Sequence, residues 1–104
     1  MALIESIGAG IIQPMNPFTP STLASLARQH GTPLWVYDAA TITARAQALR
    51  QFDVVRFAQK ANSNTHLLRL LKSQGVMVDA VSLGEVERAL AAGYTPGLKH
   101  GHAE

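Results

Sequence analysis

The sequence of 104 residues contains no cysteine. This absence excludes a disulfide-stapled secreted domain and any metal site built on cysteine ligands. Aromatic residues are also few, at 6%, and charged residues make up only 15% of the chain. Hydrophobic residues reach 47%, an ordinary share for a globular protein, which argues against disorder. The composition therefore favours a folded domain with an apolar core.

The chain also lacks a concentration of charge of either sign. Its formal net charge is +2, and the basic residues are scattered from Arg28 to Lys99 without forming a block. Nucleic acids and membrane surfaces are bound by clustered basic residues, so we expect neither partner. The first eighteen residues hold no basic residue and are broken by two glycines and two prolines. They do not resemble a signal peptide or a membrane span, and we expect a cytoplasmic location.

The clearest local signals mark a helix after Thr19. Thr19 can cap it, Pro20 suits its first turn, and Gly31 ends it. Residues 1–18 are harder to interpret, and could form a flexible leader or a short strand whose partner is absent. The remaining pattern predicts strands at 33–38, 54–60 and 76–82, and helices at 39–51, from the polar turn 62–64 to Gly75, and at 83–92.

From Asp53 onward, strands alternate with helices of about ten residues. That order predicts an α/β fold with parallel strands joined by right-handed crossovers. Two βα units cannot close a barrel, and a complete (β/α)8 barrel takes about 250 residues. We therefore interpret the sequence as incomplete. The alternative is a small, self-contained α/β domain.

Lys60 is the strongest candidate for a reactive side chain. It is expected to end the second predicted strand, at the carboxyl edge where α/β folds build their sites. Strand alternation places it on one face with Ala58, a side chain small enough to leave room for a flat ring. A partly buried lysine can act as a neutral amine and form a Schiff base with an aldehyde. Position alone, however, favours a solvated lysine at a strand end.

The surrounding sequence changes that balance. The run FAQKANSN at 57–64 resembles the cofactor-lysine motif of the fold-type III pyridoxal-phosphate enzymes, which include alanine racemases and several amino-acid decarboxylases. GTPLWVYD at 31–38 is similar to the entry strand of the diaminopimelate decarboxylases. DAVSLGE at 79–85 is similar to their second barrel strand and the turn after it. The resemblance extends over about residues 20–98.

The resemblance implies the N-terminal part of a (β/α)8 TIM-type barrel of the alanine racemase/decarboxylase type. Residues 1–30 would be a leader and helix, and residues 31–104 would begin the pyridoxal-phosphate-binding barrel. The strand at 33–38 would join a second, β domain. The rest of the barrel, with its phosphate-binding loop and substrate-binding residues, is expected beyond Glu104. We accordingly expect little activity from the 104-residue chain alone.

The resemblance also implies roles for four residues. Lys60 would hold pyridoxal 5′-phosphate covalently, Ala58 would lie against its ring, and Asp79 and Glu85 would be polar neighbours. Asp79 could instead be a strand-end carboxylate satisfied by nearby backbone. Glu85 could equally be an acid in the first turn of a helix, facing its dipole. No metal is expected, because His100 and His102 have no third ligand in view.

The activity implied by the resemblance is decarboxylation of meso-2,6-diaminopimelate to L-lysine and carbon dioxide, by a homodimer acting on a small amino-acid substrate. Three alternatives stay open at this point. A different decarboxylase or an amino-acid racemase of the same fold would keep the lysine and change the substrate. A barrel protein could bind the cofactor without turnover. The chain could also be a truncated product with no activity.

Overall fold

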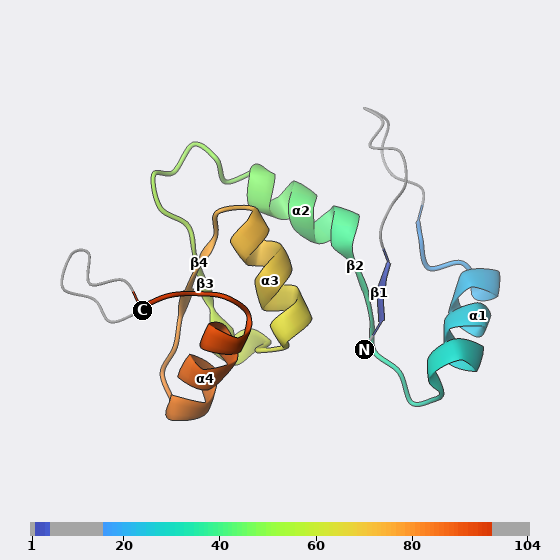
Figure 1. Cartoon of the computed structure of the whole chain (residues 1–104). Helices are drawn as coiled ribbons and strands as arrows, with labels where there is room; N and C mark the ends of the chain where they lie inside the picture. Colours follow the sequence, from blue (N-terminus) through green and yellow to red (C-terminus); the bar gives the residue numbers. More distant parts are fainter. Residues whose placement is uncertain (1, 5–15, 97–104) are drawn as a thin grey trace. The chain divides into compact units, whose positions relative to one another are not determined.

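The computed structural model describes residues 2–4 and 16–96. They belong to two compact units, residues 1–42 and residues 43–104 (Figure 1). The helix across the boundary between the units is α2, Ala39–Gln47.

Helix α1, Pro20–His30, begins and ends where its sequence predicts. The Thr19 side chain lies at the N-cap, and its Oγ1 accepts a hydrogen bond from the Thr22 N–H at 3.2 Å. At the other end, the Gly31 N–H donates to the Ala27 carbonyl at 2.8 Å. These local bonds satisfy backbone groups that a helix end leaves unpaired, which explains why both limits could be predicted.

Strand β2, Val36–Asp38, is shorter than the predicted strand at 33–38. Pro33 has no backbone N–H to offer a ladder, which favours a later start. β2 pairs in parallel with β1, Ala2–Ile4, and Ala2 lies opposite Val36. The short-strand interpretation of residues 1–18 is therefore right for residues 2–4, but the expectation that the partner is absent is wrong. A role for β2 in joining a second domain stays a prediction.

Helix α2 ends at Gln47, whereas the sequence predicts a helix as far as residue 51. The bonds after it are those of tight turns, from the Leu49 N–H to the Ala46 carbonyl at 3.1 Å and from the Arg50 N–H to the Gln47 carbonyl at 3.2 Å. Leu49 is exposed, so continued helix would bury no apolar face there. Good helix propensity alone does not extend a helix that lacks packing.

The second unit holds two βα units. Strand β3, Arg56–Ala58, leads into a short 3-10 helix, η1, Gln59–Ala61, and then into α3, Thr65–Ser73. Strand β4, Met77–Asp79, leads into α4, Leu83–Ala91. The two strands pair in parallel, with Ala58 opposite Asp79, which confirms the predicted parallel arrangement. Helix α3 crosses between the strands and contacts both β4 and α4 (Figure 1).

Only one face of this strand pair is covered by helices in the described part of the chain. Leu68 is fully buried, Val78 is 2% exposed, and Ala89 and Ala92 complete the cluster against which Phe57 packs. Residues on either side of Phe57 and Val78 in their strands belong to the opposite face, because side chains alternate along a strand. That open face carries Arg56, Ala58, Met77 and Asp79.

Both helices of this unit end with the same backbone motif, at the glycines that the sequence predicts. Gly75 and Gly93 have φ of 76° and 100°, a left-handed conformation that glycine adopts without a Cβ clash. The next residue then reaches back into the helix. The Val76 N–H donates to the Leu71 carbonyl, and the Tyr94 N–H to the Ala89 carbonyl, both at 3.0 Å. Each motif turns the chain out of its helix at a fixed point.

Tyr94 connects the exit of α4 to the rest of the core. Its hydroxyl lies 2.7 Å from the Val76 carbonyl and 3.3 Å from the Leu68 carbonyl, so the proton is shared between them. Burial disfavours the phenolate and raises the pKa of Tyr94 to about 12 from its usual 10.0. The neutral Tyr94 hydroxyl therefore stabilises the folded chain through its hydrogen bonds to backbone carbonyls.

This geometry predicts a loss of stability in alkali. Between pH 10 and about 12 the unfolded chain releases the Tyr94 proton while the folded chain retains it, so the free energy of unfolding falls as the pH rises. The contribution is fully present below pH 10. Urea unfolding followed by far-UV circular dichroism should show this fall, and Tyr94→Phe should remove its share.

The absorbance titration of the parent chain minus that of Tyr94→Phe isolates the Tyr94 phenolate. A midpoint near the ordinary tyrosine value would contradict the buried hydrogen bond. An alkaline fall in stability that is unchanged in Tyr94→Phe would also contradict it, because that fall would then come from other groups.

Candidate active site

The carboxyl ends of β3 and β4 meet at one edge of the sheet, because the strands are parallel and in register. All four predicted site residues come from this edge or from the turns that follow it. Ala58 ends β3 and Asp79 ends β4, Lys60 follows in η1, and Glu85 lies in the first turn of α4. Open α/β folds place their ligand sites at this edge.

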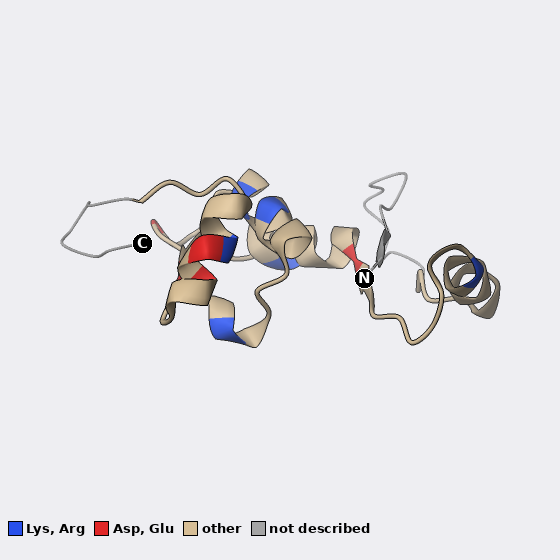
Figure 2. Ribbon diagram, turned by 60° about the horizontal axis from the view of Figure 1, so that its bottom comes forward, with Lys and Arg blue, Asp and Glu red and all other residues tan. Residues whose placement is uncertain are grey.

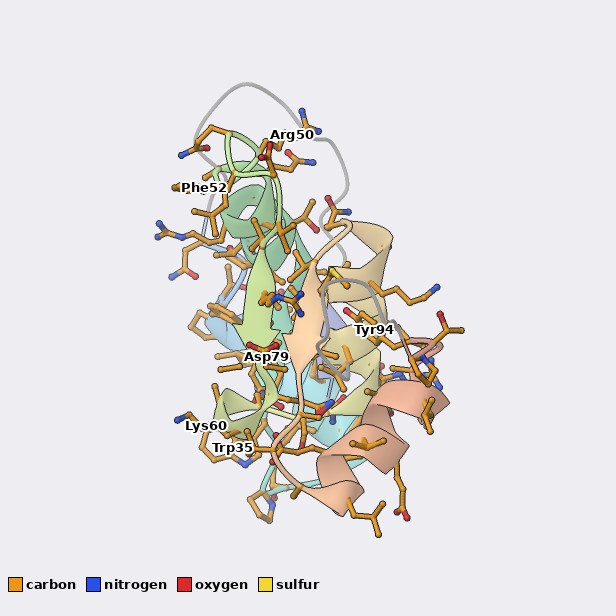
Figure 3. The ribbon with its side chains drawn as sticks, turned by 90° about the vertical axis from the view of Figure 1, so that its left-hand side faces the viewer. Trp35, Arg50, Phe52, Lys60, Asp79 and Tyr94 are labelled. Carbon is orange, nitrogen blue, oxygen red and sulfur yellow. The ribbon has the colours of Figure 1, made fainter. Side chains whose placement is uncertain are left out.

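The sequence predicts that Lys60 ends a strand. In the structure, Lys60 lies beyond the end of that strand. β3 stops at Ala58, and the chain turns into η1, which the Asn62 N–H closes by donating to the Gln59 carbonyl at 3.1 Å. Strand alternation therefore does not set the direction of the Lys60 side chain. Lys60 is exposed rather than partly buried, and it lies past the end of β3 (Figure 3). It makes no hydrogen bond or ion pair with the residues that the structure describes, so its amine is accessible.

Ala58 and Asp79 lie side by side on the open face of the strand pair. Ala58 is exposed, and the Asp79 side chain is 56% exposed. The Asp79 carboxylate is paired with a side chain and not with backbone, because Arg56 Nη1 lies 3.4 Å from its Oδ1. Strand alternation puts Arg56 on the same face as Ala58, but the sequence analysis assigns it no role. The strand register connects Arg56 to Asp79, and a single sequence does not reveal that register.

Glu85 is held in a local hydrogen-bond network at the start of α4. The Ser82 Oγ accepts from the Glu85 N–H at 3.2 Å, and its hydroxyl donates to Glu85 Oε2 at 3.1 Å. The Val81 N–H donates to Glu85 Oε1 at 3.4 Å. The arrangement resembles a capping box, with the N–H of Val81, one residue before the N-cap Ser82, as the donor to Glu85, and it stabilises the helix start. The geometry supports the structural interpretation of Glu85, and its role beside a cofactor stays a prediction.

The turn that carries Lys60 is fixed on both sides. Gln59, the residue before it, is fully buried, although its amide has no hydrogen-bond partner in the described part of the chain. After it, the Asn62 side chain accepts from the Asn64 N–H at 3.0 Å, and the Asn64 side chain caps α3 by accepting from the His66 N–H at 2.9 Å. The chain around the amine is therefore ordered by its own polar side chains.

Several other possibilities carry no site in the described residues. Residues 2–4 and 16–96 contain no group of three His, Asp or Glu side chains that could hold a metal ion. They also contain no helix long and apolar enough to cross a membrane. His100 and His102 lie outside the described residues. The Lys and Arg positions are distributed over the helices, β3 and the turns (Figure 2).

The residues at the strand edge fit a pyridoxal cofactor. An aldehyde needs an accessible primary amine, which Lys60 provides. A flat ring needs a small residue beside it, which Ala58 provides, and Asp79 beside Ala58 offers a polar neighbour. Three chemically suitable groups thus come from one sheet edge.

The family model described as "Pyridoxal-dependent decarboxylase, pyridoxal binding domain" matches residues 39–98. The diaminopimelate decarboxylase of Streptomyces coelicolor is 67% identical over 75 residues, which are 72% of this chain and 17% of the relative. That of Escherichia coli K12 is 63% identical over 78 residues, or 75% and 19% of the two chains. These matches confirm the resemblance stated from the sequence motifs.

A solved structure gives the same result. The crystal structure of a diaminopimelate decarboxylase superimposes with a TM-score of 0.67 at 64% identity, over 73% of this chain and 18% of that one. The match confirms the expected fold class, and the family model confirms pyridoxal as the cofactor of the matched domain. This chain spans less than a fifth of the length of these relatives.

The hydrogen bonds at Ser82 and Glu85 predict how α4 responds to substitution. Ser82→Ala should lower the free energy of unfolding of the 104-residue chain by about 1 kcal/mol, because it removes the cap. Glu85→Gln should cost much less, because glutamine keeps an acceptor oxygen for the capping box. Urea unfolding followed by circular dichroism measures both. Equal losses in the two variants would show that the charge of Glu85, and not its capping geometry, matters.

Proposed function

This chain belongs to the family of pyridoxal-dependent decarboxylases, and on that premise we propose that it is the part of a diaminopimelate decarboxylase that carries the cofactor lysine. The proposed reaction is decarboxylation of meso-2,6-diaminopimelate to L-lysine and carbon dioxide. The observation that carries the proposal is Lys60, an exposed amine at the carboxyl edge of a parallel strand pair, within the FAQKANSN motif.

Three side chains have distinct tasks in this proposal. Lys60 Nζ would hold the cofactor through its aldehyde carbon, with loss of water. Ala58 leaves space beside the ring, and the Asp79 carboxylate stabilises positive charge nearby. The cofactor, when bound, supplies the electron sink for the electron pair left as carbon dioxide departs.

The substrate assignment is supported by the relatives. The curated matches at 67% and 63% identity are both named diaminopimelate decarboxylases. A more distant match, at 38% identity over 84 residues, has the same name in Bacillus subtilis. A sister decarboxylase, a racemase or a non-catalytic cofactor-binding protein is therefore less favoured. We further propose that the whole enzyme is a cytoplasmic homodimer, as the family resemblance implies.

A chimera tests the proposal on this chain's own residues. In it, residues 39–98 replace the matching segment of the Escherichia coli relative. We predict that the chimera binds pyridoxal phosphate and releases carbon dioxide from diaminopimelate. Lys60→Ala should abolish the visible absorbance of covalently bound cofactor and reduce turnover to background, because no other amine lies in its place.

Lys72→Ala is the matched control, because Lys72 is also an exposed lysine but lies on α3. It should leave both absorbance and turnover unchanged. Borohydride reduction followed by peptide mass spectrometry should find the cofactor mass on Lys60. Covalent cofactor retained in Lys60→Ala would overturn the assignment, and a chimera that is insoluble or free of cofactor would count against the proposed function.

The substrate prediction is tested on the whole enzyme of which we propose this chain is a part, because the substrate-binding residues are expected outside this chain. Ornithine is shorter than diaminopimelate and lacks its distal carboxylate. A site built to bind that carboxylate should prefer diaminopimelate by at least about a hundredfold in kcat/KM, because ornithine leaves the binding groups unpaired. Release of carbon dioxide from each amino acid is the measurement. Faster turnover of ornithine or arginine would contradict the substrate proposal and leave the cofactor assignment unchanged.

A further inference from the structure

We propose that Arg56 is a positioning residue for the Asp79 carboxylate, held for this task on the open face of the strand pair. The proposal rests on the proposed function, in which Asp79 is a neighbour of the cofactor. It adds Arg56, which lies outside the cofactor-lysine motif at 57–64 and begins β3, away from the carboxyl edge.

The strand register brings the two residues together. Arg56 lies opposite Met77, and Ala58 lies opposite Asp79, in a parallel pair. All four therefore belong to the face that α3 and α4 do not cover. Arg56 and Asp79 occupy diagonal positions on this face, one strand apart, and Arg56 Nη1 approaches Asp79 Oδ1 at 3.4 Å.

The two side chains are unequally exposed, and this supports a role in which Arg56 positions Asp79 and not the reverse. The Arg56 side chain is 27% exposed and that of Asp79 is 56% exposed. The guanidinium therefore lies deeper along the strands, while the carboxylate lies nearer the edge where Lys60 follows. A cation behind a carboxylate restricts its orientation through a charge-assisted hydrogen bond. Asp79 Oδ2 accepts no hydrogen bond from the described residues, which leaves it available to a donor on a ligand.

The alternative is an ion pair of little consequence. Exposed pairs typically contribute 0 to about 1 kcal/mol, and many contribute nothing measurable. Arginine is, however, unusual in a parallel strand, where apolar residues are usual on both faces. Its place two residues before Ala58, on the face that carries the proposed site, favours a task that an apolar residue would not perform.

The experiment uses the chimera defined above, freed of cofactor and titrated with pyridoxal 5′-phosphate. Arg56→Met keeps length and removes charge, Arg56→Lys keeps charge, and Asp79→Asn removes the partner. Arg56→Met should weaken cofactor affinity about fivefold or more and alter the absorbance band of bound cofactor. Arg56→Lys should restore most of the affinity and the parental band, a rescue that a role in packing alone would not give.

The double variant Arg56→Met with Asp79→Asn decides whether the residues act together. We expect it to lose no more affinity than Asp79→Asn alone, because Arg56 acts through that carboxylate. Independent, additive losses would overturn the proposal. So would an unchanged band and affinity in Arg56→Met, including the case in which only its melting temperature falls. If Arg56→Met does not fold, Arg56→Gln replaces it with the same expectations.

The two proposals fail in different ways. A parent chimera without bound cofactor or decarboxylation contradicts the proposed function before any Arg56 variant is made. An active parent chimera whose Arg56 variants match it in band and affinity contradicts only the positioning role. An active chimera in which Asp79→Asn is harmless also contradicts it, because Arg56 would then have no functional partner.

Discussion

The parallel pairing of β3 with β4 is the constraint on which the second unit depends. Parallel neighbours cannot be joined by a tight turn, so the chain must cross over, and α3 performs that crossing. The crossing places helices on one face of the strand pair. Phe57 and Val78 then face a packed core, while Ala58 and Asp79 are left on the other face. One topological requirement thus separates the residues that stabilise the fold from those that can meet a ligand.

The same arrangement explains why the site residues lie in short, well-fixed turns. Each strand is only three residues long, so the chain leaves the ladder quickly and must be redirected by local bonds. Asn64 caps the helix after β3, and Ser82 caps the helix after β4. The Gln59 side chain is buried in the turn between β3 and α3. Lys60 consequently extends from an ordered base while its own side chain stays in solvent.

Features with a local cause could be predicted from the sequence. The start of α1 at Thr19 and the helix ends at Gly75 and Gly93 depend on residues that satisfy nearby backbone groups. Non-local features could not. The alternating pattern around Lys60 does not reveal where the backbone leaves the ladder, and the pairing of β1 with β2 joins segments more than thirty residues apart. The proposed role of Lys60 came from a motif resemblance, since its position alone favours a solvated lysine.

The side chains on the open face of β3 and β4 distinguish a ligand-binding face from a face that packs against further apolar structure. A strand pair that is simply awaiting further packing should present large apolar side chains on its open face, because both faces of parallel sheets are usually buried. This pair presents a cation at Arg56 and an anion at Asp79, with the small Ala58 opposite Asp79 and one apolar side chain, Met77, opposite Arg56. Such a surface packs poorly against a hydrophobic layer but suits a polar, planar ligand. The open face of β3 and β4 therefore carries the groups on which the proposed cofactor site depends.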